Sequence, residues 1–124
     1  HIDILGKFEQ GGQMRLNVSS VIGNMENIVD IYIFGTKGTL RLCEKKDGKK
    51  RLYGASKGSD KLEQIIIKDE NRGMWRVEEE FINAIRGKED ISHTDFSTAV
   101  KYMEWTDAVT KSLKTGYVVQ LPLR

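Results

Sequence analysis

The chain has 124 residues, of which 39% are hydrophobic and 31% are charged, and this length is typical of a single domain with a modest core. Its 20 basic and 18 acidic residues leave a formal charge of +2, which excludes the concentrated positive surplus that phosphate backbones attract. No apolar run approaches the roughly 20 residues that cross a bilayer, and a single cysteine excludes an internal disulfide framework or a self-contained thiolate metal site. We therefore expect one cytoplasmic domain over residues 1–124, without a membrane or nucleic-acid partner.

Strands are predicted over most of the first 70 residues. Six stretches have strand character, and Gly- or Asn-containing turns separate them: 2–9, 13–20, 29–34, 39–44, 51–53 and 62–68. Short strands joined by short turns predict an antiparallel meander. The second stretch alternates apolar and polar residues, whereas residues 31–34 and 65–67 are consecutive apolar runs, which is typical of strands covered on both faces.

Beyond residue 70 the apolar residues recur with the period of a helix. A first helix is predicted from Met74 to Ile85, with Glu78, Glu79 and Glu80 on its solvated side and Gly87 as its stop. A second is predicted over 95–114, with Asp95 near its start and Gly116 as its stop, and a last strand over 117–121. The inner stripe of the second helix is expected to consist of Phe96, Ala99, Val100, Met103, Thr106, Val109 and Leu113.

These elements predict an α+β fold. We expect one open, mostly antiparallel sheet of six or seven strands with two helices packed on one face. Nothing in the predicted elements remains to cover the other face, and a second copy of the same sheet is the simplest cover for it. The sequence therefore predicts a homodimer or higher oligomer through the sheet face.

Four motifs, in order, carry a resemblance to a known family. They are FEQGG at 8–12 followed by Ser19-Ser20, IYIFGTKGTLRL at 31–42, EFINAIRG at 80–87, and the stretch from Val100 to Leu121. In this order and spacing the chain resembles the second domain of the Gfo/Idh/MocA oxidoreductases, the family of glucose-fructose oxidoreductase and inositol dehydrogenase.

The resemblance implies an NAD(P)-dependent oxidoreductase that acts on a sugar, inositol or a related polyol. In that family an N-terminal Rossmann domain holds the nucleotide, and the C-terminal domain supplies substrate contacts and the oligomer interface. This sequence contains no G-x-G-x-x-G turn after a strand, no E-K-P segment with the family's catalytic lysine and no D-x-x-x-H element with its histidine. We therefore expect a C-terminal fragment that lacks the Rossmann domain, has no cofactor-binding or catalytic residue of its own, and is inactive alone.

Three residues are candidates for substrate contacts, because they lie at positions where members of the family often carry substrate-contacting side chains. Asn27, just before a strand, is placed to hydrogen-bond a hydroxyl, and a role in a turn is the alternative. Met74 and Trp75 lie where relatives often carry an aromatic residue. Trp75 is able to stack on the C–H face of a sugar, and core packing or burial in an interface is the alternative.

The remaining chemically capable residues favour structural roles. His93 lies in a polar loop before a helix, so we expect it to cap the helix or to lie at the surface rather than to act in catalysis. Cys43 is expected to be buried as a small apolar residue. No metal site is expected, because the consecutive glutamates fan around their helix.

The glycines at 35 and 38 predict a hairpin turn. The basic run at 45–51 predicts a solvated hairpin tip, and the alternative is a stand-alone sheet module that binds a protein or nucleic acid through that hairpin.

Overall fold

The computed structural model describes residues 1–92 and 95–123, and it confirms the α+β class. The chain divides into two compact units, each described by itself below. The first comprises residues 1–3 and 16–73, and the second comprises residues 4–15 and the chain from Met74 onward. His93 lies outside the described residues, so its predicted role stays a prediction.

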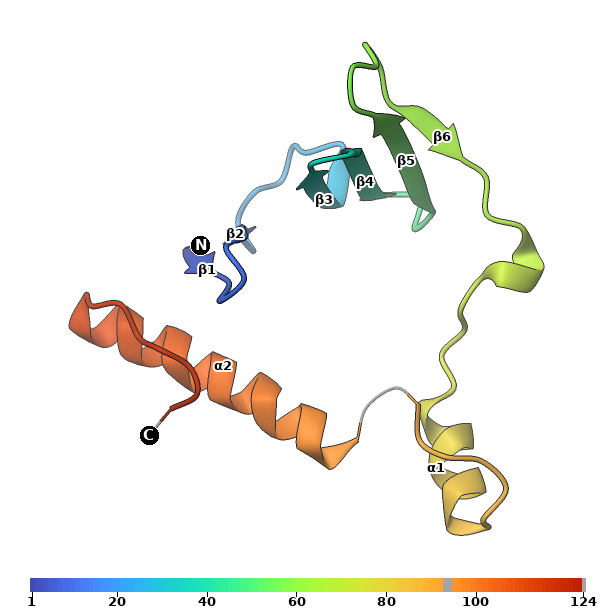
Figure 1. Ribbon diagram of the computed structural model, residues 1–124, viewed down its shortest axis with the longest axis vertical. Helices are drawn as coiled ribbons and strands as arrows, with labels where there is room; N and C mark the ends of the chain where they lie inside the picture. Colours follow the sequence, from blue (N-terminus) through green and yellow to red (C-terminus); the bar gives the residue numbers. More distant parts are fainter. Residues whose placement is uncertain (93–94, 124) are drawn as a thin grey trace. The chain divides into compact units, whose positions relative to one another are not determined.

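Four consecutive strands form an antiparallel meander in the first unit (Figure 1). They are β3 (Asn27–Gly35), β4 (Gly38–Lys45), β5 (Lys50–Ser56) and β6 (Glu63–Ile65), in that spatial order. The glycine-bounded turn at 35–38 joins β3 to β4, as predicted. The last strand is shorter than expected, since Ile66 and Ile67 lie beyond it and are exposed.

The first two strands pair only with each other, so the prediction of a single six- or seven-stranded sheet is wrong. β1 (Ile2–Lys7) and β2 (Gln13–Val18) form a two-stranded sheet. Its turn is closed by hydrogen bonds from Gly11 N to Phe8 O (2.9 Å) and from Phe8 N to Gly12 O (2.8 Å). The link at 19–26, rich in Ser, Gly and Asn, adopts no strand. β3 is therefore an edge strand of the larger sheet.

The pairing register sorts the larger sheet into two unlike faces, because directly opposed residues share a face. One, the aliphatic face, carries Val29, Ile31, Ile33, Leu40, Leu42, Leu52 and Ile65. The other, the aromatic face, carries Asp30, Tyr32, Phe34, Arg41, Cys43, Arg51 and Tyr53. Apolar residues occur on both faces, as the consecutive run predicted, but they are not covered: Ile33 is 60% exposed and Phe34 is 79% exposed.

The first helix, α1 (Val77–Ile85), begins three residues later than predicted. A short 3-10 turn, η1 (Asp69–Asn71), and an extended link precede it. Gly87 follows the helix with a φ of +65°, the left-handed conformation expected of a stop. The prediction that Glu80 faces solvent is wrong. Its residue exposure is 2%, and its carboxylate accepts hydrogen bonds from the backbone N (3.2 Å) and the Oγ (2.8 Å) of Ser92.

The second helix, α2 (Phe96–Thr115), confirms the predicted span within a residue at each end. The Asp95 side chain caps it by accepting from Thr98 N at 2.6 Å, and Gly116 ends it with a φ of +73°. The predicted strand at 117–121 is wrong. This tail instead contacts the helix, through Ser112 Oγ donating to Tyr117 O (2.8 Å) and Leu123 N donating to Glu104 Oε1 (2.6 Å).

The predicted inner stripe of α2 is also only partly covered. Within the stripe, Ala99 and Val109 are half-buried, whereas Phe96, Val100, Met103 and Leu113 are exposed. The buried residue of the helix is Ala108, which lies outside the predicted stripe. Packing of the helices on one face of the larger sheet stays a prediction. Neither helix in the described part of the chain combines the length and the hydropathy needed to span a bilayer.

Candidate functional site

Asn27 begins β3, and its side chain serves the local structure. The Nδ2 donates to Asp30 Oδ2 at 2.8 Å. The Oδ1 is buried and has no hydrogen-bond partner among the described residues. The turn role that the sequence left open is not what the structure shows, because Asn27 is part of β3. A ligand hydroxyl would have to reach the covered Oδ1, and contact with a substrate stays a prediction.

A charged and aromatic cluster on the aromatic face extends from Asn27 across β3 and β4. The Arg41 guanidinium donates to both carboxylate oxygens of Asp30, at 2.8 and 2.7 Å. This bidentate contact lowers the pKa of Asp30 and raises that of Arg41. The Arg41 Cζ also lies 5.1 Å from the centroid of the Tyr32 ring. The Tyr32 ring stacks on the Phe34 ring, with 5.7 Å between the two ring centroids. The cluster fixes four side chains of neighbouring strands in one arrangement.

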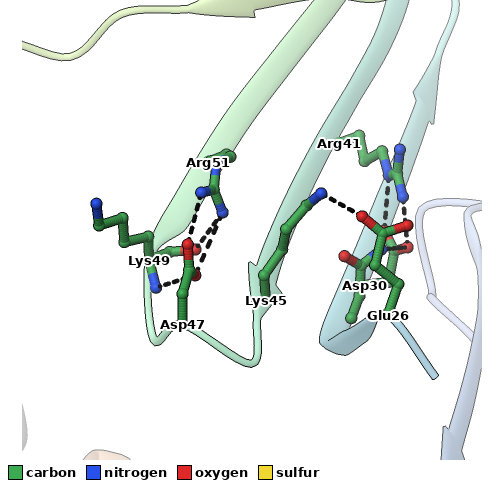
Figure 2. Close-up of polar contacts among 8 residues, drawn as sticks. Glu26, Asp30, Arg41, Lys45, Asp47, Lys49 and Arg51 are labelled. Carbon is green, nitrogen blue, oxygen red and sulfur yellow. Dashed lines mark hydrogen bonds and ion pairs between the residues drawn. The ribbon is translucent and has the colours of Figure 1, made fainter. Parts of the chain in front are cut away.

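Three of the five basic residues of the hairpin between β4 and β5 have acidic partners, and Figure 2 shows two of these ion pairs. Arg51 donates to Asp47 at 2.8 Å, Lys45 pairs with Glu26, and Lys50 lies 3.9 Å from Glu44. A paired cation contributes less attraction to a phosphate backbone than a free one. The predicted solvated hairpin tip is thus confirmed as a turn, and these pairs weigh against the alternative in which it binds nucleic acid.

Asp47 should titrate far below an ordinary aspartate. The Arg51 hydrogen bond, followed by that from Lys49 N (2.9 Å), lowers the pKa of Asp47 from 3.8 to about 2. Because the folded pKa is depressed, the stabilisation of the hairpin is complete above pH 3.8 and is lost as the pH falls through about 2. NMR of the carboxyl carbon should report a midpoint near 2. In the Arg51→Met chain it should move toward the ordinary value, and a midpoint of 3.8 in the unaltered chain would contradict this.

Met74 and Trp75 are both exposed, at 77% and 79%, in the link before α1. The Trp75 indole hydrogen-bonds the Glu78 carboxylate and lowers the pKa of Glu78. Core packing, one of the two alternatives for Trp75, is therefore not what the structure shows. The two residues belong to the second unit and Asn27 to the first, and substrate contact by the three stays a prediction.

A groove that the sequence analysis did not anticipate lies at one end of the aliphatic face. Its volume is about 1070 Å³, its apolar lining includes Ile33, Leu40 and Ile65, and the turns at 35–38 and 58–61 contribute to its rim. Gly54 is part of its lining, and a Cβ there would lie 2.8 Å from Ile65 Cδ1. The sequence analysis ended the fifth strand at residue 53, whereas the structure continues β5 to Ser56 and so places Gly54 inside a strand.

Residues with the capacity for metal or thiol chemistry are not arranged for it. Within residues 1–92 and 95–123, no three His, Cys, Asp or Glu side chains are grouped to hold a metal ion. Cys43 is 2% exposed, which confirms its predicted burial. Comparisons with known protein families, with curated proteins and with solved structures found no match for the chain.

Proposed function

We propose that this chain is the C-terminal, substrate-side and oligomerising domain of an NAD(P)-dependent oxidoreductase that acts on a sugar, inositol or a related polyol. The complete protein is cytoplasmic and carries an N-terminal Rossmann domain that binds the nucleotide. The four motifs in family order support this proposal. The antiparallel meander also supports it, because the motif at 31–42 occupies β3, the glycine turn and β4.

One observation carries the proposal furthest: the sheet presents exposed apolar side chains on both faces. Large hydrophobic residues of β3 and β4 are between 36% and 79% exposed on the two faces. Contiguous apolar surface of this kind marks an interaction site. A sheet of this construction is suited to contacting other parts of a larger enzyme.

The division of work within the proposed enzyme follows from the chemistry. Oxidation of an alcohol moves a hydride from carbon to the nicotinamide and the hydroxyl proton to a base. The Rossmann domain and the residues preceding this chain supply the nicotinamide site and the base. This chain contributes substrate contacts, for which the exposed indole of Trp75 is the best-placed candidate.

The test uses the complete polypeptide encoded by the reading frame that contains this chain. We expect it to bind NADH or NADPH, detected by quenching of protein fluorescence, and to reduce nicotinamide with at least one member of a panel of sugars and inositols. The 124-residue chain alone should give no turnover. A complete polypeptide that binds neither nucleotide would overturn the proposal.

The contribution of Trp75 is tested in the same complete protein. Trp75→Ala should raise the KM for the polyol by about tenfold, equivalent to roughly 1.4 kcal/mol of lost contact, with kcat unchanged. Phe96→Ala is the matched control, because Phe96 is an exposed aromatic residue with no proposed substrate role. An equal KM in the two variants would remove Trp75 from the substrate site.

A further inference from the structure

We propose that Asp47 is a site of spontaneous covalent modification, at which its side chain and the backbone nitrogen of Gly48 rearrange to isoaspartate, and that Arg51 controls the rate. The site lies in the turn between β4 and β5, at the tip of the basic hairpin (Figure 2). The reaction uses no cofactor and no partner protein, so the inference is independent of the proposed function.

The chemistry needs only two consecutive residues and water. The Gly48 nitrogen attacks Cγ of the neutral Asp47 carboxyl group, and an N–Cγ bond forms. The carboxyl hydroxyl and the amide proton leave together as water, which gives a five-membered succinimide. Water then adds to one of the two ring carbonyls and reopens the ring, so the water lost is regained and nothing is oxidised or reduced. Opening at the former backbone carbonyl leaves the main chain running through Cγ, as isoaspartate, and opening at Cγ restores aspartate.

Gly48 makes Asp47 the most reactive aspartate of the chain. A side chain on the residue that carries the attacking nitrogen hinders ring closure, and glycine has none. Each of the other aspartates is followed by a residue with a side chain: isoleucine, lysine, glutamate, phenylalanine or alanine. A Cβ at Gly48 would meet nothing within 4 Å, so the folded turn adds no obstruction of its own.

The site is open to the water that the second step consumes. The Asp47 side chain is 43% exposed, and Gly48 is exposed as well. Gly48 has a φ of +72°, a left-handed conformation that favours glycine at this position of the turn. The residue that permits the tight turn is therefore the same residue that permits the rearrangement.

Contacts on both reacting groups slow the reaction in the folded chain. The Asp47 carboxylate accepts hydrogen bonds from Arg51 Nη2 at 2.8 Å and from Lys49 N at 2.9 Å. The Gly48 nitrogen donates to Lys45 O at 2.9 Å. Ring closure has to break these contacts, because the carboxyl group must turn toward the nitrogen and the nitrogen must lose its proton.

Arg51 has a second effect, on the protonation of the carboxyl group. Its hydrogen bond is the largest cause that lowers the pKa of Asp47 from 3.8 to about 2, followed by that from Lys49 N. Only the neutral acid can lose its hydroxyl as water, so this shift leaves less of the reactive form at any pH above 3.8. Full return of the pKa to 3.8 would raise the neutral fraction by up to about 60-fold.

The experiment incubates the 124-residue chain in water enriched in oxygen-18 at about pH 5, where the neutral fraction follows the pKa. Cleavage after glutamate releases residues 45–63, a peptide that contains Asp47 and, as an internal control, Asp60, which precedes Lys61. Electron-transfer mass spectrometry of this peptide locates isoaspartate. Each passage through the succinimide also adds one oxygen-18 atom, even where the ring reopens to aspartate.

Arg51→Met should raise the rate of label uptake and of isoaspartate formation at residue 47 at least about tenfold. Lys50→Met is the matched control, because Lys50 is the adjacent basic residue and lies 3.9 Å from Glu44. This control should stay within about twofold of the unaltered chain. In all three chains Asp60 should take up label more slowly than Asp47.

Three outcomes would overturn the inference. Equal rates in Arg51→Met and Lys50→Met would show that Arg51 does not control the reaction. Uptake at Asp60 as fast as at Asp47, or no isoaspartate at residue 47 even in Arg51→Met, would show that this residue is not the site. If circular dichroism shows that Arg51→Met has lost the fold, Arg51→Gln, which removes the charge and keeps a long polar side chain, takes its place, and an unchanged rate there would contradict the inference.

Discussion

Gly38→Ala should lower the free energy of unfolding of the four-stranded sheet by about 3 kcal/mol. Gly38 follows the turn between β3 and β4 and pairs with Ser56 of β5. A Cβ at this position would lie 2.2 Å from the carbonyl oxygen of Ala55, and the φ of Gly38 is +159°. Because the obstacle is backbone of the central ladder, no side-chain movement relieves it, and the β4–β5 pairing has to shift.

Urea denaturation followed by far-ultraviolet circular dichroism measures this effect, with Gly35→Ala as the control. Gly35 belongs to the same turn, but a Cβ there would have its nearest neighbour at 3.4 Å and its φ is not positive. Its replacement should change stability by less than about 1 kcal/mol. Equal midpoints for the two alanine variants would show that the close approach at Gly38 is not a real constraint.

Glu80→Ala should lower the stability of the second unit by about 1.5–3 kcal/mol, the range for hydrogen bonds to charged groups. Its carboxylate holds the segment after α1 against the helix through Ser92, and Arg76 Nη1 lies 4.0 Å from it. Removal of the side chain leaves the Ser92 donors without this acceptor and opens a space beside the helix.

The matched control is Glu79→Ala, one residue earlier in α1. Glu79 is exposed and pairs with Arg76 at 3.0 Å, so its loss should cost less than about 1 kcal/mol. Melting followed by the helical signal compares the two variants. A loss for Glu80→Ala no larger than that for Glu79→Ala would mean that the buried carboxylate does not stabilise the unit.

Patterns within a few residues of sequence predicted the turns and helix ends, because these features depend on interactions between residues close together in the chain. The glycines at 35 and 38 predicted the β3–β4 turn, and Asp95 and Gly116 predicted the ends of α2. Caps and turns depend on residues within a few positions of one another, so a sequence window contains the information. The burial of Glu80 depends on Ser92, twelve residues away, and periodicity alone assigned all three glutamates to solvent.

The arrangement of the strands and of the candidate site was less predictable, because it depends on contacts between residues far apart in the sequence. Strand character in residues 2–20 was recognised, but only pairing shows that β1 and β2 form a separate sheet. Asn27 was recognised as a polar residue before a strand, and its engagement with Asp30 emerged only from the structure. The aromatic face required the register between β3 and β4, which places Arg41 opposite Tyr32.

The burial of Cys43 bears on how any self-association is interpreted. It is the chain's sole thiol, and with 2% exposure in the middle strands of the sheet it is out of reach of a sulfur from another molecule. Intermolecular disulfide cross-linking would require the sheet to open first. Any assembly that the folded chain forms should therefore be non-covalent, and adding a reductant should leave its size distribution unchanged.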